Sequence, residues 1–403
     1  MVGRVGPRVR ASTPPQESLV RGRTGRQLWL VTAGTVTFST GRFALSPLLP
    51  TITESLGISS FAAGVAMTLM FGFTAFVRYP GGQLSDQLSR KTVLVGGLVV
   101  TTGGFALLTV VWSYPAFLIA VIGIGVGIGL YSTAGIAWLS DLFTAKQGQA
   151  LGINNSSIYV AGILGAGLGN IAISTDPWQS VFLPVCLVLC GLLLALHYWN
   201  PEQYRMSGAE FDVSDTVVRL LASSTVRQML LVGTLFGTAW QGVVTFLPTF
   251  LRVEKAVSPA FANNLFALLF LVGVGSNLLA GRFSDRFPVP YIVAAVAGVT
   301  SLGLLVVVYA ETLVLLFAGV CILGAGLAAI WPALQSYMMD LFPEQSKGGD
   351  YGAFSAGYVG LASLGPSGVG FVADQFSYTV AFLGLVCCLL CSAMLALGVS
   401  RGG

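Results

Sequence analysis

Gly82-Gln83-Leu84-Ser85-Asp86-Gln87-Leu88-Ser89-Arg90-Lys91 is a short polar segment that separates two long apolar runs. The first run ends at Pro80 and the second begins at Thr92. A helix that crosses a bilayer needs about 20 apolar residues, and each run has about that length. The charged segment is therefore predicted to be a tight turn at one face of a membrane, with a membrane-spanning helix on either side.

The composition of the whole chain supports a membrane protein. Hydrophobic residues make up 55% of the chain and charged residues only 9%, whereas soluble domains carry about 25% charged residues. Lipid admits only helices and closed barrels, and the apolar runs are too long for barrel strands. The sequence thus predicts an all-α integral membrane protein. Its twelve transmembrane helices are expected at about residues 27–50, 60–83, 92–112, 115–139, 149–173, 178–198, 227–250, 259–282, 289–309, 312–335, 350–373 and 377–399.

Lys and Arg residues are distributed unevenly between the connections. Sixteen lie before the first span, in the even-numbered connections or after the last span, and only Arg252 and Lys255 lie in odd-numbered connections. Cytoplasmic segments carry the excess of positive charge. Both termini are therefore expected to be cytoplasmic, in a multi-pass protein of the cell membrane. The net charge of +4 then reflects membrane topology, and no nucleic-acid partner is expected.

The chain repeats itself at an offset of 199 positions. Gly281-Arg282-Phe283-Ser284-Asp285-Arg286 is the counterpart of the segment at 82–91, and Asp141-Leu142-Phe143 matches Asp340-Leu341-Phe342. Parallel repeats of this kind are related by an axis along the membrane normal, with a solute site between the halves near the midplane. The predicted parts are a disordered basic cytoplasmic tail (1–26), a six-helix bundle (27–199), a cytoplasmic linker (200–226) and a second six-helix bundle (227–403).

The segment at 82–91 also follows a known pattern. Its sequence, G-x-L-[small]-D-x-x-[small]-R-K between a second and a third span, resembles the signature loop of the major facilitator superfamily. Gln87 and Ser89 depart from that loop, which usually has Arg and Gly there. The resemblance covers nearly the whole chain beyond the tail. It implies two six-helix bundles that move a small solute by alternating access, with no enzymatic activity and no cofactor.

In that family the signature loop acts as a gate. The resemblance implies that Asp86 contacts the N-terminus of the eleventh helix and that Arg90 pairs with Asp141. The physical basis is that an anion suits a helix N-terminus and that a surface ion pair is weak enough to break in each cycle. A purely topogenic role for these charges is the alternative. The expected gating residues are Gly82, Asp86, Arg90, Asp141, Asp285 and Arg286, with Arg78 as a further candidate.

Arg42 is a charge deep inside the first span. It lies about 22 Å into that span, where a charge costs several kcal/mol unless it faces water, a counter-ion or a ligand. Arg42 is therefore predicted to anchor an anionic solute, whereas a structural arginine satisfied by helix carbonyls is the alternative. It belongs to a polar stripe on one helical face, which the seventh span repeats with Gln241 in place of the arginine. The two stripes, expected to face a shared cavity, are Thr35, Ser39, Arg42 and Ser46, and Thr234, Thr238, Gln241 and Thr245.

Other polar residues within the spans are weaker candidates. Arg78 lies near the cytoplasmic end of the second span and is matched by Asn277 in the second half; snorkelling and a place in the permeation path both fit. Glycines are dense in the fifth and eleventh spans, where they favour tight helix packing or allow the two helices to bend and slide as the bundles move. Pro366 favours a bend in the eleventh span, because proline removes a backbone hydrogen bond. The remaining candidates for solute contacts, each as well suited to an interhelical contact, are Tyr131, Asn155, Trp331 and Tyr358.

An enzyme, an exporter of other compounds and a membrane sensor are the alternatives to an anion transporter. The six cysteines all lie within predicted spans and form no disulfide or metal frame, and no nucleophile motif indicates an enzyme. An exporter of hydrophobic or cationic compounds on the same fold would require Arg42 to be structural. A membrane sensor that binds a solute without moving it is opposed by the short loops. We expect a monomer in the lipid bilayer with a small-molecule solute.

Overall fold

The computed structural model describes residues 17–402 except 201, 205–219, 285–287 and 344–346. Across these residues the regular structure is helical, and no strand occurs. The helices of the first half are α1 (Gly22–Leu56), α2 (Ser60–Gln87), α3 (Arg90–Leu108), α4 (Tyr114–Leu142), α5 (Gln147–Ile173) and α6 (Leu183–Trp199), the last preceded by the single turn η1 (Trp178–Phe182). Those of the second half are α8 (Ser224–Val253), α9 (Pro259–Ser284), α10 (Val289–Tyr309), α11 (Leu313–Leu341), α12 (Lys347–Ala362), α13 (Gly365–Gln375) and α14 (Tyr378–Gly402).

These helices supply twelve membrane crossings, as the apolar runs predict. In the described part of the chain eleven segments are long and apolar enough to cross a membrane, with α12 and α13 together forming one of them. The twelfth crossing is α1, a 35-residue helix whose polar residues reduce its hydropathy. Because the number of crossings is even, the start of α1 and the end of α14 lie at the same face. We call this face the terminal face and the other the opposite face.

Local sequence sets several helix ends. Ser59 and Ser89 begin α2 and α3 by accepting a hydrogen bond from the backbone N–H three residues later. Gly57 ends α1 in the left-handed conformation, with φ of 62°. Pro366 lies in the first turn of α13, where its missing N–H leaves no intrahelical bond unmade. The predicted bend at Pro366 is confirmed as a break between α12 and α13, whereas α5, equally rich in glycine, is continuous.

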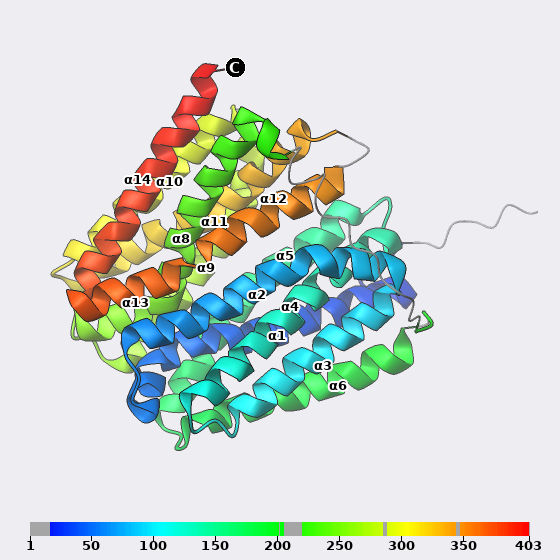
Figure 1. Cartoon of the computed structure of the whole chain (residues 1–403), viewed down its shortest axis with the longest axis horizontal. Helices are drawn as coiled ribbons and strands as arrows, with labels where there is room; N and C mark the ends of the chain where they lie inside the picture. Colours follow the sequence, from blue (N-terminus) through cyan, green and yellow to red (C-terminus); the bar gives the residue numbers. More distant parts are fainter. Residues whose placement is uncertain (1–16, 201, 205–219, 285–287, 344–346, 403) are drawn as a thin grey trace, which may run out of the picture.

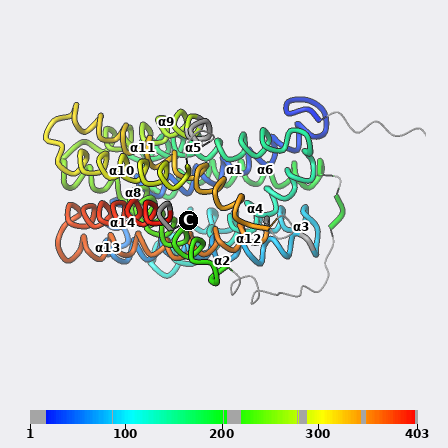
Figure 2. The backbone as a smooth tube through the Cα atoms, turned by 90° about the horizontal axis from the view of Figure 1, so that it is seen from above, coloured from blue at the N-terminus to red at the C-terminus, as the bar shows by residue number. Residues whose placement is uncertain are grey.

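The helices form two bundles that meet along a few long contacts. α1 to α6 pack with one another, as do α8 to α14, while α2 contacts α12 and α13, and α5 contacts α9 across the interface. Figure 1 shows the bundles close together at the lower left and diverging toward the end of α14. Figure 2 shows α10, α11 and α14 on one side of the molecule and α3 and α6 on the other. The helices of the two bundles are therefore closer together at the opposite face than at the terminal face.

Hydrogen bonds hold the bundles together at the opposite face. The Asp374 carboxylate, at the end of α13, accepts the backbone N–H groups of Ser60 (3.1 Å) and Phe61 (2.8 Å) at the start of α2. The Tyr378 hydroxyl donates to Ser60 Oγ (2.9 Å). On the other side of the axis, Asn170 Nδ2 donates to Asn264 Oδ1 (2.9 Å). These contacts, which we call the opposite-face seam, close that side of the molecule.

Two glycines allow the seam to close. A Cβ atom at Gly370 would collide with the Ser60 carbonyl oxygen, and one at Gly64 would collide with the Pro366 carbonyl oxygen. The backbones of α2 and α13 therefore pack directly on each other, as small residues permit in membrane helices.

The described structure begins at residue 17, before the predicted start of the first span. Glu17 accepts the backbone N–H groups of Thr144, Ala145 and Lys146, and the Thr144 hydroxyl donates to it at 2.7 Å. The Thr144 hydroxyl bond, with these backbone bonds, lowers the pKa of Glu17 to about 2. The predicted disordered tail is thus wrong for residues 17–26, because this charged anchor is in place and α1 begins at Gly22. The rest of the predicted tail, 1–16, lies outside the described residues, as does most of the predicted linker.

Gly370→Leu tests whether close packing of α2 and α13 seals the opposite face. We expect it to favour the conformation that is open there, because the new side chain meets the Ser60 backbone. The measurement is the rate of thiol labelling at Ser46→Cys, a position 2% exposed, in a protein whose native cysteines are replaced by serine. Gly368→Leu is the matched control, since a Cβ there meets no atom within 4 Å. Equal labelling of the two folded variants would contradict this account.

Candidate functional site

The two polar stripes meet across the interface. Ser46 Oγ on α1 donates to the Thr245 carbonyl on α8 at 2.8 Å, and both residues are buried. These residues are 199 positions apart, so equivalent positions of the two halves contact each other. The rings of Phe43 and Phe270 lie beside this contact, with centroids 4.7 Å apart. Together these contacts close the space between the bundles toward the opposite face.

Arg42 lies one helical turn from Ser46, on the side of the terminal face. Its guanidinium carbon is 4.6 Å from the Phe43 ring centroid and 5.7 Å from that of Phe71. Its Nε atom is buried without a hydrogen-bond partner. Across the described residues, no carboxylate forms an ion pair with Arg42, and the guanidinium remains charged. Aromatic faces alone stabilise a cation by about 0.5–2 kcal/mol, so these rings offset only part of the several kcal/mol that a charge at this depth costs.

Gln241 is the counterpart of Arg42 on α8. It is 4% exposed, its Nε2 approaches the Val359 carbonyl at 3.4 Å, and its Oε1 is buried without a partner. The hydroxyls of Thr234 and Thr245 also lack partners, and Thr238 is half-buried. This face of α8 thus offers neutral polar atoms.

Part of the α1 stripe points into the first bundle. The Thr35 hydroxyl lies 3.1 Å from both the Val31 carbonyl and Asn154 Oδ1, and Ser39 is 2% exposed. The Tyr131 hydroxyl donates to the same Val31 carbonyl at 3.1 Å, and its side chain is fully buried. These contacts favour an interhelical role for Thr35 and Tyr131. Asn155 is exposed, and its neighbour Asn154 is the residue that bonds to α1.

Arg78 and its counterpart Asn277 both face a tyrosine of the other bundle. Asn277 Nδ2 donates to the Tyr159 hydroxyl at 3.1 Å. Arg78 interacts electrostatically with Tyr358 on α12 and also with Arg42. Because α2 packs against α12, Arg78 lies on a helix of the first bundle that contacts the second bundle, within electrostatic range of Arg42.

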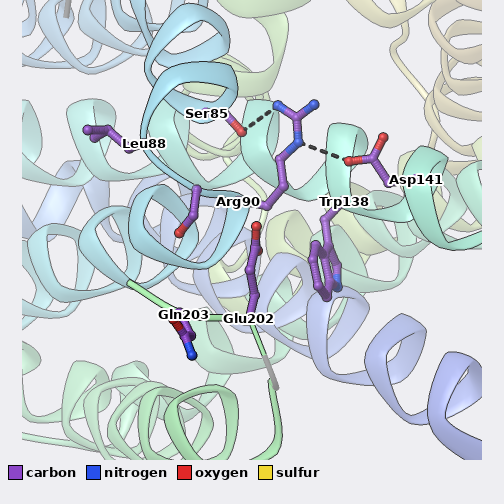
Figure 3. Close-up of a pocket in the computed structure, with 8 residues that line it drawn as sticks. Ser85, Leu88, Arg90, Trp138, Asp141, Glu202 and Gln203 are labelled. Atoms are coloured by element: carbon purple, nitrogen blue, oxygen red, sulfur yellow. Dashed lines mark hydrogen bonds and ion pairs between the residues drawn. The ribbon is translucent and has the colours of Figure 1, made fainter. Parts of the chain in front are cut away.

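The signature segment forms a charged cluster at the terminal face. Arg90 Nε donates to Asp141 Oδ2 at 3.0 Å, and its Nη1 donates to Ser85 Oγ at 3.0 Å. Figure 3 shows Arg90 reaching between these two groups in a cavity of about 330 Å³ that Glu202 also lines. The predicted Arg90–Asp141 pair is therefore present. Gly82 lies in α2, and a Cβ atom added to it would lie 3.5 Å from the Thr133 methyl group.

Three predicted gating residues cannot be placed among these contacts. The Asp86 side chain lies outside the described part of the structure, as do Asp285 and Arg286 entirely. The predicted contact of Asp86 with the eleventh span therefore stays a prediction.

Comparison with known proteins identifies the family. The Major Facilitator Superfamily profile matches residues 31–348 and again 229–401. The chain belongs to the major facilitator superfamily. An uncharacterized MFS-type transporter of Burkholderia mallei (strain SAVP1) is 26% identical over 82% of this chain and 81% of its own length. A probable sugar efflux transporter of Pasteurella multocida (strain Pm70) is 21% identical over 92% of this chain and 90% of its own.

Solved structures confirm the predicted fold of this superfamily member. The crystal structure of a bacterial homolog to the human lysosomal transporter Spinster superposes with a TM-score of 0.81, at 15% identity, over 94% of this chain and 98% of that one. The predicted all-α, twelve-helix, two-bundle class is thus confirmed. The family comprises membrane transporters rather than enzymes.

Sequence reasoning missed several residues of this transporter. Asp374 has no counterpart in the repeat, so neither periodicity nor duplication singled it out. From the sequence, Lys91 is only a charge in the signature segment. In the structure its Nζ donates to the His197 and Asn200 carbonyls at 2.9 Å and holds the end of α6. A lysine that is 7% exposed has no signal in the sequence beyond its place in the signature loop.

An exchange of charges tests the latch in this transporter. We expect Arg90→Asp to lower the labelling rate of Ser46→Cys by up to about fivefold, because we predict that the pair holds the signature segment in place for the state open at the opposite face and an exposed pair contributes about 0–1 kcal/mol. Arg90→Asp combined with Asp141→Arg should restore most of the rate. The unfolding temperature should change little, since exposed ion pairs contribute about 0–1 kcal/mol. A double variant as slow as the single one would contradict a latch role for the pair.

Proposed function

We propose that this transporter moves a small organic or inorganic anion by alternating access, with Arg42 as the anchor. The observation that carries the proposal is the position of Arg42, a permanent cation between the bundles with no carboxylate partner among the described residues. A buried charge without a partner is unfavourable by several kcal/mol. A carboxylate or phosphate group bound by the guanidinium would remove that cost through paired, charge-assisted hydrogen bonds.

The proposed orientation places the terminal face in the cytoplasm of the cell. It rests on the excess of Lys and Arg at that face, including Arg90 and Lys91. The opposite-face seam would then close the external side, and the solute would reach Arg42 from the cytoplasm. On the external side a cavity of about 450 Å³, lined by Thr51, Arg252 and Asn263 among others, would become continuous with the site when the seam opens.

Alternating access would exchange the contacts of the two faces. Opening outward breaks the bonds of Asp374 to the start of α2 and brings the terminal ends of the bundles together. The signature segment would then latch that face through Asp86, with Arg90 and Asp141 holding the segment in place. Since the site and the seams belong to one chain, a monomer suffices for the cycle.

A sugar-like neutral solute is the second candidate. It is favoured by the relative described as a probable sugar efflux transporter and by the unpartnered oxygen of Gln241. Export of hydrophobic cations is disfavoured, because Arg42 and Arg78 would repel the cargo.

Arg42→Gln and Arg42→Lys separate these candidates. Purified protein in liposomes is tested by counterflow with carboxylates, phosphate, neutral sugars and a hydrophobic cation. We expect anion transport that falls about 10- to 150-fold in Arg42→Gln, since a hydrogen bond to a charged group contributes about 1.5–3 kcal/mol. Arg42→Lys keeps the charge but loses the planar fork, so an intermediate rate is expected.

Arg227→Gln is the matched control for this series, because Arg227 lies at the start of α8 and donates to the Leu221 carbonyl. Anion transport that survives Arg42→Gln unchanged, or transport of neutral sugars alone, would overturn the anion proposal.

A further inference from the structure

Four aromatic side chains of the second bundle pack on one another. Trp331 on α11 stacks on Tyr358 of α12, with ring centroids 5.7 Å apart and planes at 17°. Phe236 and Trp240 of α8 meet Trp331 edge-on, at 5.8 and 6.4 Å. We call these four residues, Phe236, Trp240, Trp331 and Tyr358, the aromatic cluster. Trp331 is its centre, since it contacts each of the others.

The accessible surface of the aromatic cluster comes from its two indoles. Phe236 is fully buried and Tyr358 is 7% exposed, whereas Trp240 and Trp331 are partly exposed. The buried rings therefore back the indoles and fix their orientation. Tryptophan in membrane proteins is enriched at the two interfaces, so a rigid pair of indoles farther inside suggests a specific role.

The aromatic cluster and the arginines lie at similar depth. Counted from the opposite-face ends of their helices at 1.5 Å per residue, Arg42 is about 21 Å deep, and Arg78 and Trp331 are each about 27 Å deep. Arg78, from the first bundle, is close enough to Tyr358 to interact electrostatically. Because α2 packs against α12 and Tyr358 stacks on Trp331, Arg78 and the two aromatic residues lie on helices that connect one bundle to the other.

The two walls have different chemistry. The first bundle contributes two cations that repel each other and that no described carboxylate neutralises. The second contributes flat aromatic faces and the buried, unpartnered Oε1 of Gln241. An aliphatic dianion would satisfy only the first wall, and a neutral sugar would leave the arginines unpaired. A flat apolar body with a carboxylate at one end satisfies both walls, and a hydroxyl on that body would satisfy Gln241.

We propose that the solute is a small aromatic carboxylate, held with its carboxylate at Arg42 and Arg78 and its ring against Trp331 and Trp240. This inference rests on the proposed anion transport and adds the class of anion. It assigns Trp331 to solute selection, because a ring gains both apolar burial and stacking on the indole. Contacts to both walls also give the solute a way to draw the bundles together, since each wall belongs to a different bundle.

The test compares two matched carboxylates on the purified full-length transporter. 4-Hydroxybenzoate is the aromatic probe, and acetate is the carboxylate without a ring. Binding is measured by calorimetry and transport by counterflow in liposomes, for wild type, Trp331→Leu, Trp331→Phe and Arg42→Gln. Trp112→Leu is the control, because Trp112 lies in the connection between α3 and α4 and is 74% exposed.

We expect Trp331→Leu to weaken binding of 4-hydroxybenzoate by about tenfold and to leave acetate unchanged. Trp331→Phe should retain most of the affinity; this variant keeps a ring in the cluster and so separates loss of stacking from loss of folding. Arg42→Gln should weaken both carboxylates. Trp112→Leu should change neither.

The outcomes separate the two proposals. If Arg42→Gln weakens both carboxylates but Trp331→Leu affects them equally or not at all, the aromatic class is wrong and the anion proposal stands. If neither carboxylate binds the wild type, the aromatic class is wrong, and the counterflow panel with phosphate decides the anion proposal. If the carboxylates bind but Arg42→Gln has no effect on them, both proposals fail.

Discussion

The proposed transport depends on a buried charge that has no carboxylate partner among the described residues. Arg42 lies between two bundles of apolar helices, with two phenylalanine rings beside it and an Nε atom without a partner. A guanidinium cannot release its proton to escape this environment. Charged residues make up only 9% of the whole chain. This cation, one helical turn from the point where equivalent positions of the two halves meet, is the basis of the proposed anion site.

In the proposed cycle, the seam closes the approach to Arg42 from the opposite face. Asp374 ties the start of α2 to the end of α13, and Gly64 and Gly370 let the backbones approach closely enough for those bonds to form. To reverse a 99:1 preference between two states, a ligand must bind the minor state about 10⁴-fold more tightly. One arginine on one wall supplies too little of that difference, so a solute that contacts both bundles is the more effective switch.

Most of the fold could be predicted, because membrane-length apolar runs leave few alternatives. The fifth span was predicted at 149–173 and is α5, Gln147–Ile173. The end of α1 was placed too early, since polar residues after Pro50 continue the helix beyond the hydrocarbon region to Leu56. The duplication also placed the two stripes opposite each other, and the Ser46–Thr245 contact has that arrangement.

The site was less predictable because helical periodicity gives relative faces and not their absolute direction. Asn155 is expected from the sequence to contact the solute but is exposed, and its neighbour Asn154 is the residue that contacts Thr35. Tyr131 is turned into its own bundle for the same reason. The bond of Asp374 to Ser60 joins residues 314 positions apart, and neither periodicity nor the internal repeat contains that information. Such contacts depend on how the bundles tilt, which composition does not specify.

The most direct test of the central claim is the nitrogen-15 NMR signal of the Arg42 Nε–H group. The full-length transporter would carry labelled arginine, with Arg42→Lys used to assign the signal. On titration with 4-hydroxybenzoate, the account predicts that the Arg42 signal shifts in a saturable manner, because the unpartnered Nε–H acquires an acceptor. A signal that stays fixed while binding is detected by calorimetry would show that the anion is held elsewhere and would contradict the account.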